Sequence, residues 1–268
     1  MSFKIGFSVG SNEDVLDRCF EVPPAVAARK SVVKVRFPSK SVTLSYYNDK
    51  FDLHVGNLVF VEGKLEGVRG VVAEVNYGFK IKLSDYKRVV AVADTSVCGR
   101  FYFAGSHLVT FDRNALPKEI AVGWFKVPSD EEFVCGSDES AFLLDDLQGM
   151  GVSTAIAERG YEYYSKNLVR YVCVDGNRGY AVVEGGRIYE VEFEYCNGEI
   201  RNLTCTCFCD CNCKHEFAVM LQLRETLEFV TKHYSHEYDG AGYFAAIYKG
   251  SFFSVAIDGN EVGSISLC

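Results

Sequence analysis

The residues of this chain with the clearest potential for chemistry lie between positions 205 and 215. Thiolate sulfur and imidazole nitrogen together favour zinc, which takes four ligands in a closed tetrahedral site. In this cysteine segment, every second residue is such a ligand: Cys205, Cys207, Cys209, Cys211, Cys213 and His215. The segment therefore predicts a metal centre, and spacing must select the ligands.

Spacing favours the two outer pairs of the cysteine segment. Cys205 and Cys207 form a C-x-C pair at the end of an expected strand, where alternate side chains point to one side. Cys213 and His215 form a C-x-H pair at the start of an expected helix, and five residues separate the pairs. Because the loop between them lets the chain fold back, we expect these four residues to bind zinc.

The segments on either side predict a hairpin and a helix. Residues 189–195 alternate apolar and acidic side chains, as a half-buried strand does, and Asn197-Gly198 supplies a tight turn. A partner strand follows from Ile200 to Cys205. Downstream, apolar residues from Phe217 to Val230 fall on one broad face at helical spacing.

The C-x-C and C-x-H pairs, set between a hairpin and an apolar helix, resemble the SWIM zinc finger. The similarity covers residues 150–232 and includes a lead-in from Arg159 to Tyr164. It implies a part in protein–protein or nucleic-acid interaction. The five-residue gap is short for the family and contains Cys209 and Cys211, which are alternates for an outer ligand.

Other roles for the cysteine segment are an iron–sulfur cluster, a disulfide knot or a chance cluster of inert thiols. The C-x-H pair favours zinc over a cluster held by four thiolates. A disulfide knot needs an oxidising compartment, whereas the amino terminus lacks the apolar stretch of a secretory signal, so we expect a cytoplasmic protein. The remaining cysteines are expected to be small core residues or free thiols: Cys19, Cys98, Cys135, Cys173, Cys196 and Cys268.

The composition predicts a β-rich α+β protein. Among 268 residues, Gly is frequent (24), Pro is scarce (5), and Tyr (16) and Phe (20) are plentiful, as expected for strands joined by tight turns. No apolar run approaches the roughly 20 residues that span a bilayer, so no membrane association is expected.

We expect two domains, residues 1–128 and 141–268. The first has strand patterns from Val32 to Phe37 and from Val42 to Tyr46, then glycine-spaced apolar segments similar to an SH3-like small barrel of the KOW type. The second is expected to hold an antiparallel meander of four strands between residues 168 and 205, the helix, and a terminal three-stranded meander. Those last strands are predicted at 243–248, 252–257 and 262–267.

Charge separates the partner hypotheses. Residues 1–110 hold 15 Lys and Arg against 11 Asp and Glu, whereas the remainder holds 13 against 25. Since phosphate neutralisation supplies most nucleic-acid affinity, DNA or RNA would contact only the basic amino-terminal part. The candidates on that part are Lys34, Arg36, Lys80 and Lys82. The favoured hypothesis is a protein partner that docks on the acidic carboxy-terminal half.

Enzymatic activity is the least favoured hypothesis. Four protein ligands leave zinc no open position for a substrate, and cysteines committed to zinc are not free nucleophiles. Glu216 follows His215, but position 219 is Val, so the zincin pattern His-Glu-x-x-His is absent. A zinc- or cysteine-dependent enzyme remains an alternative. We expect a non-enzymatic protein with structural zinc and no small-molecule substrate.

Overall fold

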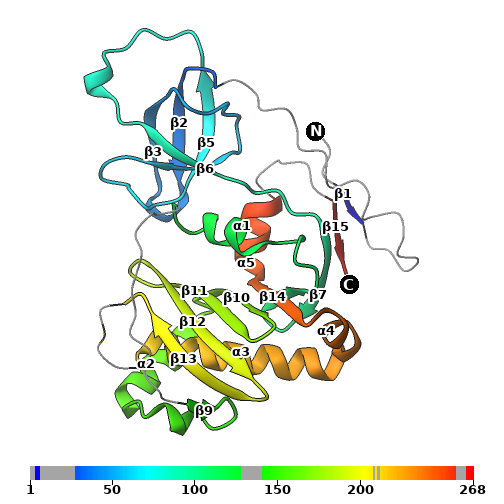
Figure 1. Cartoon of the computed structure of the whole chain (residues 1–268). Helices are drawn as coiled ribbons and strands as arrows, with labels where there is room; N and C mark the ends of the chain where they lie inside the picture. The colour runs from blue at the N-terminus through cyan, green and yellow to red at the C-terminus, as the bar shows by residue number, and fades with distance from the viewer. Residues whose placement is uncertain (1–3, 7–27, 128–140, 208, 210–211, 258–263) are drawn as a thin grey trace.

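A computed structural model of the chain describes residues 4–6, 28–127, 141–207, 209, 212–257 and 264–268. These residues form a mixed α+β fold with two β-sheets. The five-stranded sheet occupies one end of an elongated molecule, and the ten-stranded sheet and its helices make up the rest (Figure 1).

The ten-stranded sheet has the order β1-β15-β7-β8-β14-β10-β11-β12-β13-β9. Its pairs are antiparallel, except that β15 runs parallel to both β1 and β7. In chain order, its strands are β1 (Lys4–Gly6), β7 (Gly99–Ala104), β8 (His107–Thr110), β9 (Ala141–Leu143), β10 (Val169–Asp175), β11 (Arg178–Glu184), β12 (Ile188–Cys196), β13 (Glu199–Cys205), β14 (Tyr243–Tyr248) and β15 (Ser264–Leu267).

The five-stranded sheet has the order β3-β2-β5-β4-β6 and does not close into a barrel. A barrel needs a continuous ladder between its first and last strands. Here the two edges meet only at an isolated bridge between Tyr47 and Arg88, so the expected SH3-like barrel is not confirmed. The strands are β2 (Ser31–Phe37), β3 (Val42–Asn48), β4 (Leu58–Val61), β5 (Gly70–Asn76) and β6 (Val89–Ala93).

Helices cover both faces of the ten-stranded sheet (Figure 1). α2 (Thr154–Ser165) and α3 (Lys214–His233) lie on one face, and α4 (Ser235–Ala241) follows α3. α1 (Lys118–Gly123) and α5 (Lys249–Phe252) lie on the other. Short helical turns occupy Pro38–Lys40, Leu83–Asp85 and Leu147–Met150, and a π-helical turn at Phe253–Ile257 extends α5. No helix in the described part of the chain is long and apolar enough to cross a membrane.

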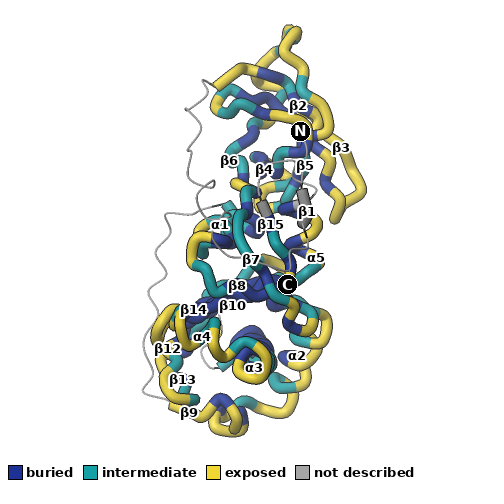
Figure 2. Tube along the Cα trace, turned by 90° about the vertical axis from the view of Figure 1, so that its right-hand side faces the viewer, coloured by how far each residue is buried: buried dark blue, intermediate teal, exposed yellow. Residues whose placement is uncertain are grey.

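The alternation of side chains along the central strands creates two hydrophobic cores. In β10, Val172 and Val174 pack on the α3 side, whereas Tyr171 and Cys173 pack on the α1 side. Figure 2 shows β8, β10 and β14 as buried segments between these layers. Because the first of these cores lies between the ten-stranded sheet and α3, this sheet holds the helix along its length. A third core lies within the five-stranded sheet.

The structure confirms the hairpin, the helix and the four-stranded meander predicted from the sequence. β10 to β13 pair in succession. Asn197 and Gly198 turn the chain between β12 and β13 with φ of 51° and 85°. Both angles lie in the left-handed region that the Asn-Gly pattern predicts.

The prediction of a terminal three-stranded meander is wrong. Residues 252–257 are helical, and Phe252 is fully buried against Phe101, with ring centroids 4.9 Å apart. β15 pairs with β7 rather than with β14. A short apolar run such as residues 252–257 fits both a strand and a buried helical turn, so the sequence pattern alone could not distinguish the two.

The sheet also crosses the domain boundary expected near residues 128–140. β7 and β8 precede that boundary, yet β8 pairs with β14 and β7 pairs with β15. These pairings join chain segments more than a hundred residues apart, so local composition carries no signal of them.

Gly160 allows α2 to approach the start of α3. A Cβ at this position would lie 2.8 Å from Phe217 Cδ1 and 3.0 Å from the Lys214 carbonyl oxygen. We expect Gly160→Ala to lower the free energy of unfolding by about 1–3 kcal/mol, because the backbone oxygen cannot move aside without disturbing the helix.

A matched variant, Gly240→Ala in α4, has nothing within 4 Å of the added Cβ. Alanine there should be neutral or should stabilise by up to about 1 kcal/mol. Urea denaturation of both variants measures the difference, and equal stabilities would contradict the close packing of α2 on α3.

Candidate metal centre

The structure brings together the four residues that spacing selected. The ligand atoms of Cys205, Cys207, Cys213 and His215 all lie within 4.8 Å of one another. Cys213 and His215 are buried, and Cys205 and Cys207 are half-buried. Three sulfurs and one nitrogen at this separation can hold a metal ion.

The distances match a tetrahedral ion bound through Nδ1 of His215. Bonds of about 2.3 Å to sulfur and about 2.0–2.1 Å to nitrogen place neighbouring tetrahedral ligands about 3.6–3.8 Å apart. Nδ1 of His215 lies 3.6 Å from the Cys213 sulfur and 3.8 Å from the Cys205 sulfur. These two distances are compatible with a metal ion held between the two sulfurs and Nδ1 of His215.

The β12–β13 hairpin positions the first pair of ligands. Two hydrogen bonds of 3.0 Å join Glu190 and Thr206, one from the Glu190 amide to the Thr206 hydroxyl and one from the Thr206 amide to the Glu190 carbonyl. They extend the pairing of the two strands one residue beyond the end of β13. Cys205 and Cys207 flank Thr206, so the last rung of the hairpin fixes both.

The start of α3 positions the second pair. Cys213 is the N-cap residue, and its sulfur accepts a hydrogen bond from the Glu216 amide at 3.5 Å. The Cys213 amide donates in return to the Glu216 carboxylate at 2.6 Å, which completes a capping box. The positive end of the helix dipole also favours a thiolate here.

Two tyrosines hold the imidazole of His215 in place. Tyr189 of β12 stacks on the ring, with centroids 3.9 Å apart and an interplanar angle of 20°. Tyr163 of α2 contacts it edge-on at 5.2 Å. Because the ring is held between a strand and a helix, its Nδ1 atom remains directed at the sulfurs of Cys205 and Cys213.

The pKa values describe a site suited to a cation. Burial, followed by the positive charges of Lys214 and Arg187, lowers the pKa of His215 to about 4, so its imidazole is neutral at pH 7. Burial, followed by the proximity of Cys213, raises the pKa of Cys207 to about 12. The pKa of Cys213 is also raised, chiefly by its hydrogen bond with Cys205. Without a cation the thiols of Cys207 and Cys213 keep their protons, and a dication reverses that preference.

The remaining cysteines have different environments. Cys209 is exposed and is not one of the four, and Cys211 lies outside the described residues. Cys173 is a buried free thiol, whereas Cys196 and Cys268 are exposed free thiols. Cys98 is disulfide-bonded, so the expectation of a core residue or free thiol is wrong for it.

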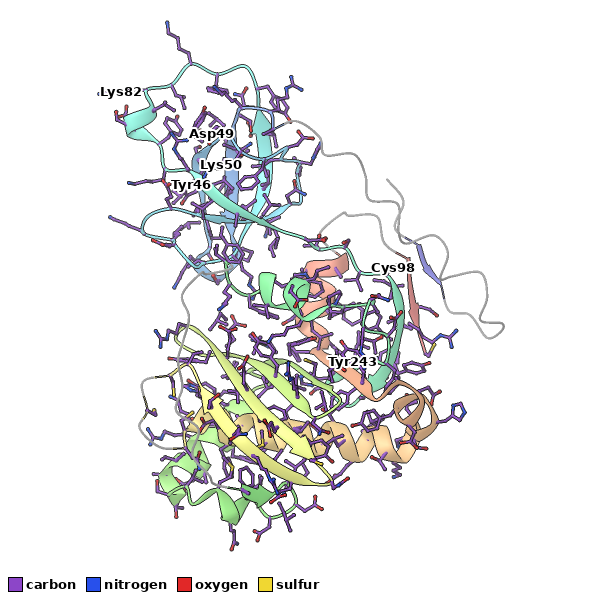
Figure 3. All side chains as sticks on the ribbon, viewed as in Figure 1. Tyr46, Asp49, Lys50, Lys82, Cys98 and Tyr243 are labelled. Carbon is purple, nitrogen blue, oxygen red and sulfur yellow. The ribbon has the colours of Figure 1, made fainter. Side chains whose placement is uncertain are left out.

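The candidate nucleic-acid residues lie on the strands and loops of the five-stranded sheet, whereas this centre lies at the ten-stranded sheet. Lys34 and Arg36 are exposed on β2, and Lys34 forms an ion pair of 2.7 Å with Glu74. Lys80 and Lys82 are exposed between β5 and β6. Figure 3 shows Lys82 projecting from the outer end of the five-stranded sheet.

Sequence reasoning missed the residues that support the ligands. The Cys213-x-x-Glu216 spacing is that of a capping box, which was a usable signal. Tyr163 and Tyr189 carry no such signal, because their contact with His215 depends on the approach of α2 and β12 in space.

No protein-family model, curated protein or solved structure matches this chain. The SWIM resemblance is therefore not confirmed and rests on the sequence pattern of this chain alone.

Removing a buried ligand should empty the centre and unfold its surroundings. We expect Cys213→Ala and His215→Ala to lose the metal and to expose residues 188–232 to hydrogen exchange, while the five-stranded sheet stays protected. A structural metal contributes on the order of 10 kcal/mol to folding in small fingers. Elemental analysis gives the metal content, and retention of about one metal per chain in both variants would disprove the assignment.

The spare thiol provides the matched control. Cys209→Ser should keep the metal and Cys207→Ser should lose it, because only Cys207 belongs to the cluster. Loss of the metal in Cys209→Ser with retention in Cys207→Ser would mean that Cys209 is the ligand.

Metal affinity should fall as the pH falls. Because the pKa of Cys207 is raised to about 12 and that of Cys213 is also raised, an incoming metal must displace protons from these thiols at neutral pH. We expect the release of about two to three protons for each metal ion bound. For each proton released, the affinity for the metal should fall about tenfold when the pH falls by one unit. Chelator competition between about pH 8 and pH 6 measures this, and a constant affinity would contradict it.

Proposed function

We propose that this chain binds zinc as a structural ion, in a SWIM-like module that mediates protein–protein interaction. The observation that carries the proposal is the convergence of three cysteine sulfurs and one histidine nitrogen, all from one short segment. Sulfur and nitrogen donors in this ratio are typical of structural zinc.

The placement of the ligands supports a structural role. Four protein ligands satisfy a tetrahedral ion and leave no position for a substrate or an activated water. The centre joins the end of β13 to the first turn of α3, and α3 covers one hydrophobic core of the sheet. Binding of zinc therefore stabilises the part of the fold that depends on this junction.

The environment of Cys173 gives no support to the alternative of a cysteine-dependent enzyme. Burial raises the pKa of this thiol to about 11, so it stays protonated at neutral pH. The thiolate is the nucleophilic form, and reactive cysteines have lowered rather than raised pKa values. We therefore propose that the protein is not an enzyme.

The distribution of charge supports a protein partner. β12 presents Glu190, Glu192 and Glu194 on one face of the sheet, opposite the face that packs on α3. Carboxylates repel a phosphate backbone, whereas they attract basic protein segments. The acidic half of the chain thus favours a protein over a nucleic acid.

Cobalt substitution tests whether the centre is closed. Co²⁺ can replace Zn²⁺, and its visible absorption reports the ligands around it. We expect the spectrum of the Co²⁺-loaded chain to stay unchanged when azide or thiocyanate is added, because no coordination position is open. A spectral shift would show an exchangeable position and would favour the enzyme alternative.

The five-stranded sheet carries the alternative of a nucleic-acid-associated factor. Arg36, Lys80 and Lys82 are exposed there, and no ion pair of theirs occurs among the described residues. Such residues can contact phosphates without involving the metal centre.

A gel-shift titration separates the two partner classes. We expect no binding of duplex DNA or single-stranded RNA below tens of micromolar at physiological salt. Binding that is lost in the double variant Lys80→Glu, Lys82→Glu would establish the alternative. Cross-linking of the full chain in nuclease-treated extract from its native cell should in turn join a protein to residues 141–268.

A further inference from the structure

A large open cleft lies on the face of the ten-stranded sheet opposite α3. Its volume is about 1030 Å³, and its lining comes from α1 and the segment before it, and from the strands β10 to β14. The metal ligands lie outside its lining. Figure 3 labels Tyr243, which stands at the β14 side of this cleft.

A buried tyrosine, Tyr171, is among the residues that line the cleft. Tyr171 is fully buried, and its hydroxyl makes no hydrogen bond of standard geometry within the described residues, although Cys173 and Tyr243 lie beside it. Buried polar atoms are nearly always hydrogen-bonded, so an exception that faces a cleft indicates a place for a ligand atom. A phenol oxygen can accept a hydrogen bond from an ammonium or guanidinium group.

A cation of the chain itself already occupies part of the cleft. The Lys118 ammonium lies 3.6 Å from the centroid of the Tyr180 ring and 3.5 Å from the Glu192 carboxylate. An aromatic face with an adjacent carboxylate is a favourable environment for an ammonium group. Lys118 therefore shows which chemistry this part of the cleft accepts.

The remaining charges favour a further cation. Lining carboxylates outnumber lining cations by four to three. Glu119 and Glu194 are exposed and form no ion pair in the described part of the chain, although Glu194 lies across the sheet from Arg178 of β11 and Arg201 of β13. The carboxylates are Glu119, Asp175, Glu192 and Glu194, and the cations are Arg113, Lys118 and Arg178.

We propose that this cleft binds an extended segment of a partner protein with lysine or arginine at alternate positions, and that Lys118 is an intramolecular competitor for the first of those cations. This inference rests on the proposed function and identifies the class of partner. Glu192 and Glu194 lie two residues apart on one face of β12, so their spacing is about 6.6–6.8 Å. Alternate side chains of an extended peptide have the same spacing, which matches its cations to both carboxylates.

Fluorescence anisotropy with the zinc-loaded full chain tests the proposal, with a labelled alternating Ala-Lys hexapeptide as the probe. We expect the double variant Glu192→Gln, Glu194→Gln to weaken binding about tenfold. Lys118→Met should strengthen it about threefold, because the competing ammonium is removed while the aliphatic stem is kept. Glu162→Gln, on α2 at the opposite face, is the matched control and should leave binding unchanged.

Weaker binding of the Ala-Lys hexapeptide to the Lys118→Met variant would overturn the proposal. An anionic ligand would bind more weakly to Lys118→Met, and an alternating Ala-Glu hexapeptide would then be the better probe. Equal binding of spermidine, or equal loss in the control variant, would show non-specific attraction and would also overturn it. If the hexapeptide does not bind as expected but a protein cross-links to residues 141–268 outside the cleft, the cleft proposal is wrong and the proposed protein–protein interaction is still supported.

Discussion

The structure depends most on the meeting of the β12–β13 hairpin with the first turn of α3. Four potential metal ligands converge at this junction. Burial raises the pKa of Cys207 and lowers that of His215, and the hydrogen bond with Cys205 raises the pKa of Cys213. One buried thiol, two half-buried thiols and a buried imidazole whose Nε2 atom has no hydrogen-bond partner among the described residues do not form a favourable core by themselves. A metal ion converts the same groups into a cross-link between strand and helix.

The junction in turn organises one face of the large sheet. α3 buries an apolar stripe that includes Val219, Leu223 and Val230 against β10 to β13. α2 packs on α3 through Gly160 and brings Tyr163 to the imidazole of His215. The opposite face packs against α1 and α5 and contains the cleft. One sheet thus carries the candidate metal centre at the edge of one face and an open cleft on the other.

Local patterns were sufficient to predict the parts of this structure that form from neighbouring residues. The Asn197-Gly198 turn, the strands it joins and the helix after His215 are coded by short-range spacing. The convergence of Cys205, Cys207, Cys213 and His215 could be predicted because all four come from eleven residues. The parallel pairing of β15, the helix at 249–257 and the Tyr171 cleft could not, because each depends on contacts between distant segments.

The most direct test of the central claim is X-ray absorption spectroscopy at the zinc edge of the purified chain. The geometry predicts three sulfur scatterers at about 2.3 Å and one nitrogen scatterer at about 2.0 Å, with the imidazole pattern of a histidine. Four sulfurs would mean that a spare cysteine replaces His215. An oxygen in the first shell would mean an open position, and either result would contradict a closed structural site made by Cys205, Cys207, Cys213 and His215.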